Sequence, residues 1–107
     1  MYYQNNQNKS QKRSEFELLI TISGHLSRAK TTNDLIDVLL WNKRIWDIFA
    51  NDCADENNPF PRELKLNIIK LSMFVNSHTM NILNGIDTDI DILIEINKIV
   101  ARGLNDQ

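Results

Sequence analysis

Apolar residues recur at intervals of three and four along most of the chain, which is the spacing of one face of an α-helix. This pattern predicts helices over about residues 14–30, 33–52, 61–83 and 88–102. The connections between these segments are short, so consecutive helices should pack as antiparallel neighbours. No segment shows a strand-like pattern. We therefore predict an all-α fold, a small bundle of about four antiparallel helices with a polar N-terminal tail.

Residues that favour helix ends lie at the predicted boundaries. Thr31 or Thr32 is the expected N-cap of the second helix, because a hydroxyl can accept a hydrogen bond from a free backbone N–H. Thr88 and Asp91 have the spacing of a capping box at the start of the fourth helix. Asn84 and Gly85 are expected to end the third helix as its C-cap, and Gly103 is expected just beyond the end of the fourth helix.

The third predicted helix carries two apolar stripes on nearly opposite sides, where one stripe would serve a core. Either this helix is central in the bundle or a partner covers its second stripe. Two large residues of the second predicted helix lie off the centre of its apolar face and leave the same choice between core and partner contact. The candidate partner-binding residues are Trp41, Ile48, Leu66, Ile69, Met73 and Met80.

Two aromatic residues, Trp46 and Phe49, lie on the core face of the second helix and should pack it on the third. Asn42 lies within the same apolar face, so its amide should be hydrogen-bonded, to backbone or to the end of another helix. Asp52 and the loop at residues 57–59 are expected to fix the reversal between these two helices.

The chain has 107 residues, of which 42% are hydrophobic, and this suits a single domain. We expect a polar tail over residues 1–13 and one helical domain over residues 14–107. No apolar run approaches the about 18 residues that span a bilayer, and the first residues lack the apolar stretch of a signal peptide. The lone Cys53 fits a reducing compartment. The expected location is the cytoplasm.

Reactive side chains are few. Two histidines, His25 and His78, and one cysteine are not spaced to bind zinc, and the sequence has no Gly-rich phosphate-binding loop. Each histidine is more simply read as a structural residue, and Cys53 as a small buried apolar one. We expect no enzymatic activity, no cofactor and no metal site.

The charge is unevenly distributed along the chain. The formal net charge is −2, but residues 1–44 carry +3 and residues 45–107 carry −5. Nucleic-acid-binding proteins usually show a clustered basic patch. The basic first part leaves room for an RNA contact, although no interleaving of aromatic and basic residues supports one.

Residues 42–65 combine an Asn, a basic pair, a Trp, an aliphatic–aromatic pair, an Asp, an Asn/Pro-rich loop and a Pro-x-Glu-Leu-Lys ending. This combination resembles the signature of the FlaF family of flagellar biosynthesis regulators, and residues 93–104 also look like the C-terminus of that family. The residues that match the signature are Asn42, Lys43 or Arg44, Trp46, Ile48, Phe49, Asp52, Asn57 to Pro59, Pro61, Glu63, Leu64 and Lys65.

The resemblance implies a role in bacterial flagellum assembly, with flagellin as the protein partner. Members of the family help flagellin production or keep flagellin competent for export, often alongside the translational regulator FlbT. Two functions follow from the resemblance. The first is a flagellin-binding chaperone or regulator. The alternative is a post-transcriptional regulator of flagellin that acts on RNA directly or through FlbT.

Overall fold

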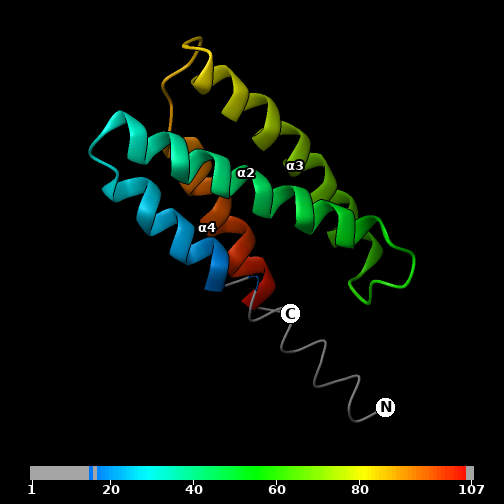
Figure 1. The fold of residues 1–107 in the computed structure, drawn as a ribbon. Helices are drawn as coiled ribbons and strands as arrows, with labels where there is room; N and C mark the ends of the chain where they lie inside the picture. The colour runs from blue at the N-terminus through cyan, green and yellow to red at the C-terminus, as the bar shows by residue number, and fades with distance from the viewer. Residues whose placement is uncertain (1–14, 16, 106–107) are drawn as a thin grey trace.

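A computed structural model of the chain describes residues 15 and 17–105, and these form four helices (Figure 1). The first helix comprises residues 15 and 17–28. It is followed by α2 (Thr32–Ala54), α3 (Arg62–Leu83) and α4 (Asp91–Asn105). Within this part of the chain there is no strand, so the all-α prediction is confirmed. The predicted tail over residues 1–13 lies outside the described residues.

Consecutive helices run in opposite directions, and α3 lies along one side of α2 (Figure 1). The core lies between the helices and takes a fully buried side chain from each of them, including Ile22, Trp46, Ile68 and Leu93. Burial of side chains of this size is the main stabilising contribution in a bundle. No helix among the described residues is both long enough and apolar enough to cross a membrane.

A side-chain cap fixes the start of α2. The Thr31 hydroxyl accepts a hydrogen bond from the backbone N–H of Asp34 at 3.1 Å, so Thr31, and not Thr32, is the N-cap. The acidic side chain of Asp34 lies in the first turn, where the helix dipole favours negative charge. At its other end α2 continues to Ala54, two residues beyond the predicted end.

The turn between α2 and α3 is held by side chains that replace missing helical hydrogen bonds. The Asp55 carboxylate accepts from the N–H of Asn57 at 2.9 Å, and the Asn58 amide oxygen accepts from the N–H of Phe60 at 2.9 Å. Asp52 contributes only its backbone carbonyl, which accepts from the N–H of Asp55 at 3.3 Å. The loop was therefore predicted correctly, and Asp52 takes part in the reversal through its backbone carbonyl.

The end of α3 has the hydrogen bonds of a Schellman motif. The N–H of Gly85 donates to the carbonyl of Ile82 at 3.0 Å, and the N–H of Ile86 donates to that of Asn81 at 2.8 Å. The motif needs a left-handed residue, and Gly85 supplies it with a φ of +75°. The predicted end of the third helix at Asn84 and Gly85 is confirmed.

Both predicted boundary signals of the last helix differ from the structure. The side chain that caps α4 is Asp89, whose carboxylate accepts from the N–H of Ile92 at 3.2 Å, so the predicted Thr88–Asp91 capping box is wrong. Because α4 begins at Asp91, the Asp89 side chain is better placed than that of Thr88 to accept from a free N–H of the first turn. Gly103 lies inside α4 and does not end it.

Candidate functional site

The most concentrated group of polar side chains in the core joins α2 to α4. The Trp46 indole N–H donates to the Asn97 amide oxygen at 2.8 Å, and the Asn97 amide NH₂ donates to the Asn42 amide oxygen at 2.7 Å. All three side chains are fully buried. We call Asn42, Trp46 and Asn97 the buried polar seam. Asn42 was expected to bond to backbone or to a helix end, but its partner is a side chain within α4.

A further contact ties α3 to the same place. The Ser72 hydroxyl donates to the backbone carbonyl of Trp46 at 3.3 Å, and Ser72 is buried. Nearby, the Asn76 amide NH₂ donates to the Asp47 carboxylate at 2.8 Å. Amides, an indole and a hydroxyl offer neither a nucleophile activated by a base nor a general acid. The seam fixes how three helices align and is not suited to reaction chemistry.

The other residues of the predicted structural motif divide between core and turn. Phe49 is buried against Trp46 and Phe60, with ring centroids 5.9 and 6.3 Å apart. Leu64 is half-buried against the core. Three more are exposed: Asp52 in the last turn of α2, Pro61 as the N-cap of α3, and Glu63 in the first turn of α3. Pro61 was predicted to be the first residue of the third helix. In the structure it is the N-cap, and the helix begins one residue later.

Four apolar side chains of α3 point away from the core. Leu66 is 46% exposed, Met73 69%, Phe74 44% and Met80 43%. Leu66, Met73 and Met80 are seven residues apart, so they lie almost in line along the helix. We call these four residues the outer face of α3. Ile69, which was grouped with them, is half-buried and packs against the core.

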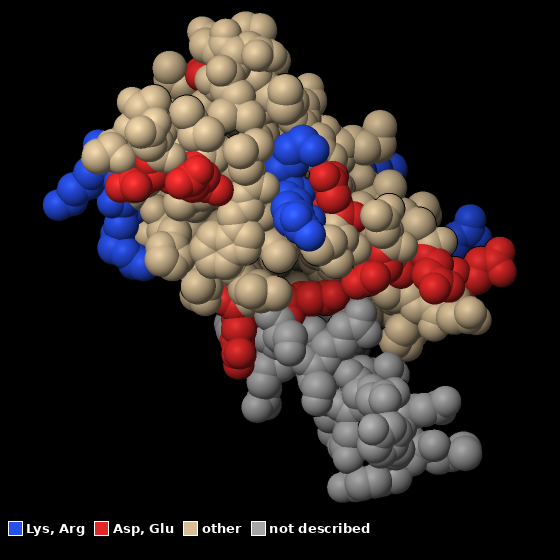
Figure 2. All heavy atoms as spheres, in the orientation of Figure 1, with Lys and Arg blue, Asp and Glu red and all other residues tan. Residues whose placement is uncertain are grey.

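The outer face continues into a part of the chain without charge. From residue 71 to residue 86 there is no Lys, Arg, Asp or Glu. As a consequence, the end of the molecule formed by the C-terminal half of α3 and the following turn is almost entirely uncharged (Figure 2). Ile86 in that turn is also exposed. Several large apolar side chains exposed on one side of a helix are a candidate interaction site.

The two candidates on α2 differ from each other. Ile48 is exposed and lines a small hollow whose other lining residues are apolar except for Glu15. Trp41 is half-buried and packs against the core, and its ring lies 5.5 Å from that of His25 on the first helix. Of the two alternatives left open by the sequence, Trp41 therefore contributes to the bundle, whereas Ile48 remains available to a partner.

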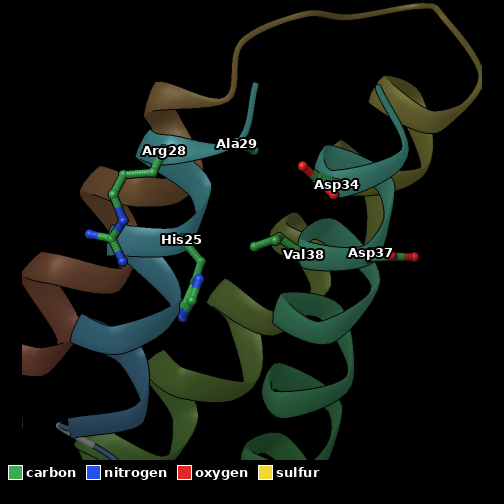
Figure 3. Close-up of a pocket in the computed structure, with 6 residues that line it drawn as sticks. All are labelled: His25, Arg28, Ala29, Asp34, Asp37 and Val38. Carbon is green, nitrogen blue, oxygen red and sulfur yellow. The ribbon is translucent and has the colours of Figure 1, made fainter. Parts of the chain in front are cut away.

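A cleft of about 250 Å³ opens between the end of the first helix and the start of α2. Arg28 and His25 line it from the first helix, and Asp34 and Asp37 from α2 (Figure 3). Val38 points into the space between the two helices (Figure 3). The charges that line this cleft are of both signs, so it does not provide the clustered basic surface that RNA binding requires.

The remaining titratable groups have structural surroundings. The Nε2 of His78 lies 2.7 Å from the backbone carbonyl of Asp89, and its ring stacks on Phe74 with centroids 5.4 Å apart. Burial raises the pKa of the Cys53 thiol to about 12, with the charges of Glu15 and Asp52 adding to the effect. Among residues 15 and 17–105, no three His, Cys, Asp or Glu side chains gather to hold a metal ion.

Sequence reasoning identified Asn42 but missed its partner. Asn97 is a polar residue within the apolar face of α4, flanked by Leu93 and Val100, and this is the same signal that marked Asn42. Phe74 was also missed, because it lies to one side of the seven-residue stripe.

The family described as "Flagellar protein FlaF" matches residues 1–104, which is nearly the whole chain. No curated protein and no solved structure matches it.

Proposed function

The chain belongs to the FlaF family of flagellar proteins, and from this premise we propose that it binds flagellin. In this proposal it acts as a chaperone or regulator that supports flagellin production and export during flagellum assembly. The observation that carries the proposal is the outer face of α3, an exposed apolar surface on a helix whose opposite side is already packed in the core.

The chemistry of this surface suits an amphipathic helix. Flagellin's ends form such helices in the filament, and before assembly their apolar faces need cover. A helix can lay its apolar stripe along Leu66, Met73 and Met80, whose seven-residue spacing matches the repeat of two packed helices. Methionine side chains are flexible and polarisable, so the surface can adapt to a partner. Covering the partner's stripe would also compete with premature assembly.

The alternative, post-transcriptional regulation through RNA, has less support from the surface. Among the described basic side chains of the N-terminal half, two lie close to acidic ones. Lys43 is paired with Asp47 at 3.1 Å, and Arg28 lines the cleft whose other wall carries Asp34 and Asp37. An indirect effect on RNA through a partner such as FlbT requires no basic patch and is compatible with the same outer face.

The test is Met73→Glu in the full chain, with co-purification of flagellin as the measurement. Because the Met73 side chain is largely exposed, a carboxylate there stays hydrated and the fold should survive, as circular dichroism would show. The bound flagellin should fall at least tenfold. Ile99→Glu is the matched control, since Ile99 is also exposed but lies on α4.

Two outcomes would contradict the proposal. A folded Met73→Glu protein that retains flagellin as well as the Ile99→Glu control does would remove the outer face from the interaction. A wild-type chain that retains flagellin leader RNA but no flagellin, at moderate salt, would favour the alternative function.

A further inference from the structure

The outer face of α3 has a charge direction along its length, and we propose that it sets the orientation of the bound flagellin helix. The helix would lie with its acidic end over Arg62 and Lys70 and its uncharged end over Met80. This inference rests on the proposed flagellin binding and adds the register and polarity of the partner to it.

Two exposed cations bracket one end of the outer face. Arg62 and Lys70 lie four residues before and four residues after Leu66, so one turn of helix separates each of them from it on the same side of α3. Neither cation has an ion-pair partner among the described residues. The third basic residue of this segment, Lys65, is directed elsewhere, because its ammonium group donates to the carbonyl of Asn58 at 3.3 Å.

The opposite end of the same face could not accept a charge. No charged residue occurs between positions 71 and 86, and the large exposed apolar side chains of α3 there are Met73, Phe74 and Met80. A carboxylate or ammonium group of the partner placed over Met80 would lose water and gain no counter-ion, which is costly. A carboxylate over Lys70 would gain one. An amphipathic helix with acidic residues at one end only would therefore bind more tightly with that end near Lys70 than with that end near Met80.

The length of the face suits a helical segment better than a point contact. Leu66 and Met80 are fourteen residues apart, or about 21 Å along the axis at 1.5 Å per residue. A partner helix of four turns covers this distance. Glu63, in the first turn of α3, lies beside the cations, and Asp55 and Glu56 lie in the turn before the helix, so the positive charge is confined to the surroundings of Arg62 and Lys70.

The decisive variant is the double charge reversal Arg62→Glu with Lys70→Glu in the full chain. The matched control is Lys98→Glu with Arg102→Glu, which makes the same change of net charge on exposed positions of α4. At low salt, we expect the reversal at α3 to weaken flagellin binding about tenfold and to make the affinity less sensitive to salt. The control should change the affinity less than twofold.

A second measurement locates the acidic end directly. Carbodiimide joins an amine to a carboxylate in direct contact, so the wild-type complex should give a cross-link between Lys70 and an Asp or Glu of a flagellin terminal helix. Lys70→Arg keeps the charge and removes the amine. It should bind normally and lose this cross-link, which separates the charge from the reaction used to detect it.

The outcomes distinguish this inference from its premise. Wild-type protein that fails to bind flagellin removes both. Wild-type protein that binds, with a reversal at α3 that has no more effect than the control, overturns the orientation and leaves flagellin binding intact. A reversal that changes only the self-association of the chain, measured by sedimentation, also overturns the inference, because it would assign this face to a second copy.

Discussion

Between α2 and α4, polar side chains are buried; on the far side of α3, apolar side chains are exposed. Both regions depart from the usual amphipathic pattern, and each departure has a different meaning. In the buried polar seam, each amide and indole is directed at one partner, so a shift of one helix along another would break the bonds at 2.7 and 2.8 Å. On the outer face of α3, by contrast, the side chains of Met73 and Met80 are exposed.

This difference explains why the most recognisable residues of the chain are not its proposed binding residues. Asn42 and Trp46, which match the signature that the sequence resembles, are both tied to Asn97 in the core. The outer face needs only apolar side chains at a suitable spacing, which many sequences can supply. We infer that the signature specifies the packing of α4 on α2 and leaves α3 free to present its outer face.

The strongest way to test this division is Trp46→Ala. Removing a fully buried indole creates a cavity and leaves the Asn97 amide oxygen without its donor, so we expect a loss of about 3–5 kcal/mol. A domain of this size has about 5–15 kcal/mol in total. Urea denaturation or thermal melting measures the loss. A variant that melts within a few degrees of wild type would show that Trp46 acts in binding and not in packing.

The next effect concerns the amides alone. Asn97→Leu leaves the Asn42 oxygen and the Trp46 indole N–H buried and unpaired, and should cost about 2–4 kcal/mol. Asn42→Leu should cost less, because Asn97 keeps its bond to Trp46. In the double variant the two losses should be non-additive by about 1 kcal/mol or more. Additive losses in a full double-mutant cycle would show that the Asn42–Asn97 bond does not couple α2 to α4.

The sequence was informative wherever a residue type has one main structural meaning. Helix content followed from apolar spacing, and the end of α3 followed from Gly85, whose left-handed conformation few other residues adopt. Boundaries were less predictable where several polar residues compete. Four residues before and at the start of α4 have side chains that can cap a helix: Asp87, Thr88, Asp89 and Asp91. Which of them does so depends on the path of the chain between the end of α3 and the start of α4, and in the structure it is Asp89.

The candidate site was predictable in part for a related reason. Periodicity separates the two sides of α3, so Leu66, Met73 and Met80 were found. It does not show how far a neighbouring helix covers each side, and Ile69 is half-buried for that reason. The partner of Asn42 depends on which helix packs across α2, and one-dimensional spacing does not contain that information.

Substitutions on the outer face of α3 should have little effect on stability, in contrast to those in the buried polar seam. Met73→Ser and Met80→Ser remove apolar groups that are already in contact with water, so each should change stability by less than about 0.5 kcal/mol. Ile68→Ser, five residues before Met73 but fully buried, is the matched control and should be severely destabilising. Equal losses at Met73 and Ile68 would mean that the outer face is part of the core.

The smallest expected effect concerns the connection between the two regions. Asp87 follows the uncharged end of α3, and its carboxylate accepts from the N–H of Asp89 at 2.9 Å and of Thr88 at 2.7 Å. These hydrogen bonds, first that from Asp89, and the nearby His78 hold the pKa of the Asp87 carboxyl below its usual value. A lowered pKa in the folded state means that ionised Asp87 favours folding.

The sign of the pH dependence follows from this shift. The stabilisation is fully present above the unfolded-state pKa of about 3.9 and is lost as the pH falls through the lower folded-state value. Asp87→Asn keeps an oxygen acceptor for both N–H groups but has no charge to lose. Urea unfolding at pH 6 should therefore find the wild type slightly more stable than Asp87→Asn, and the gap should close below about pH 4. A gap that widens in acid would mean that the neutral form of Asp87 is the one that the connection prefers, and that α3 and α4 are joined by packing of the turn without help from its charge.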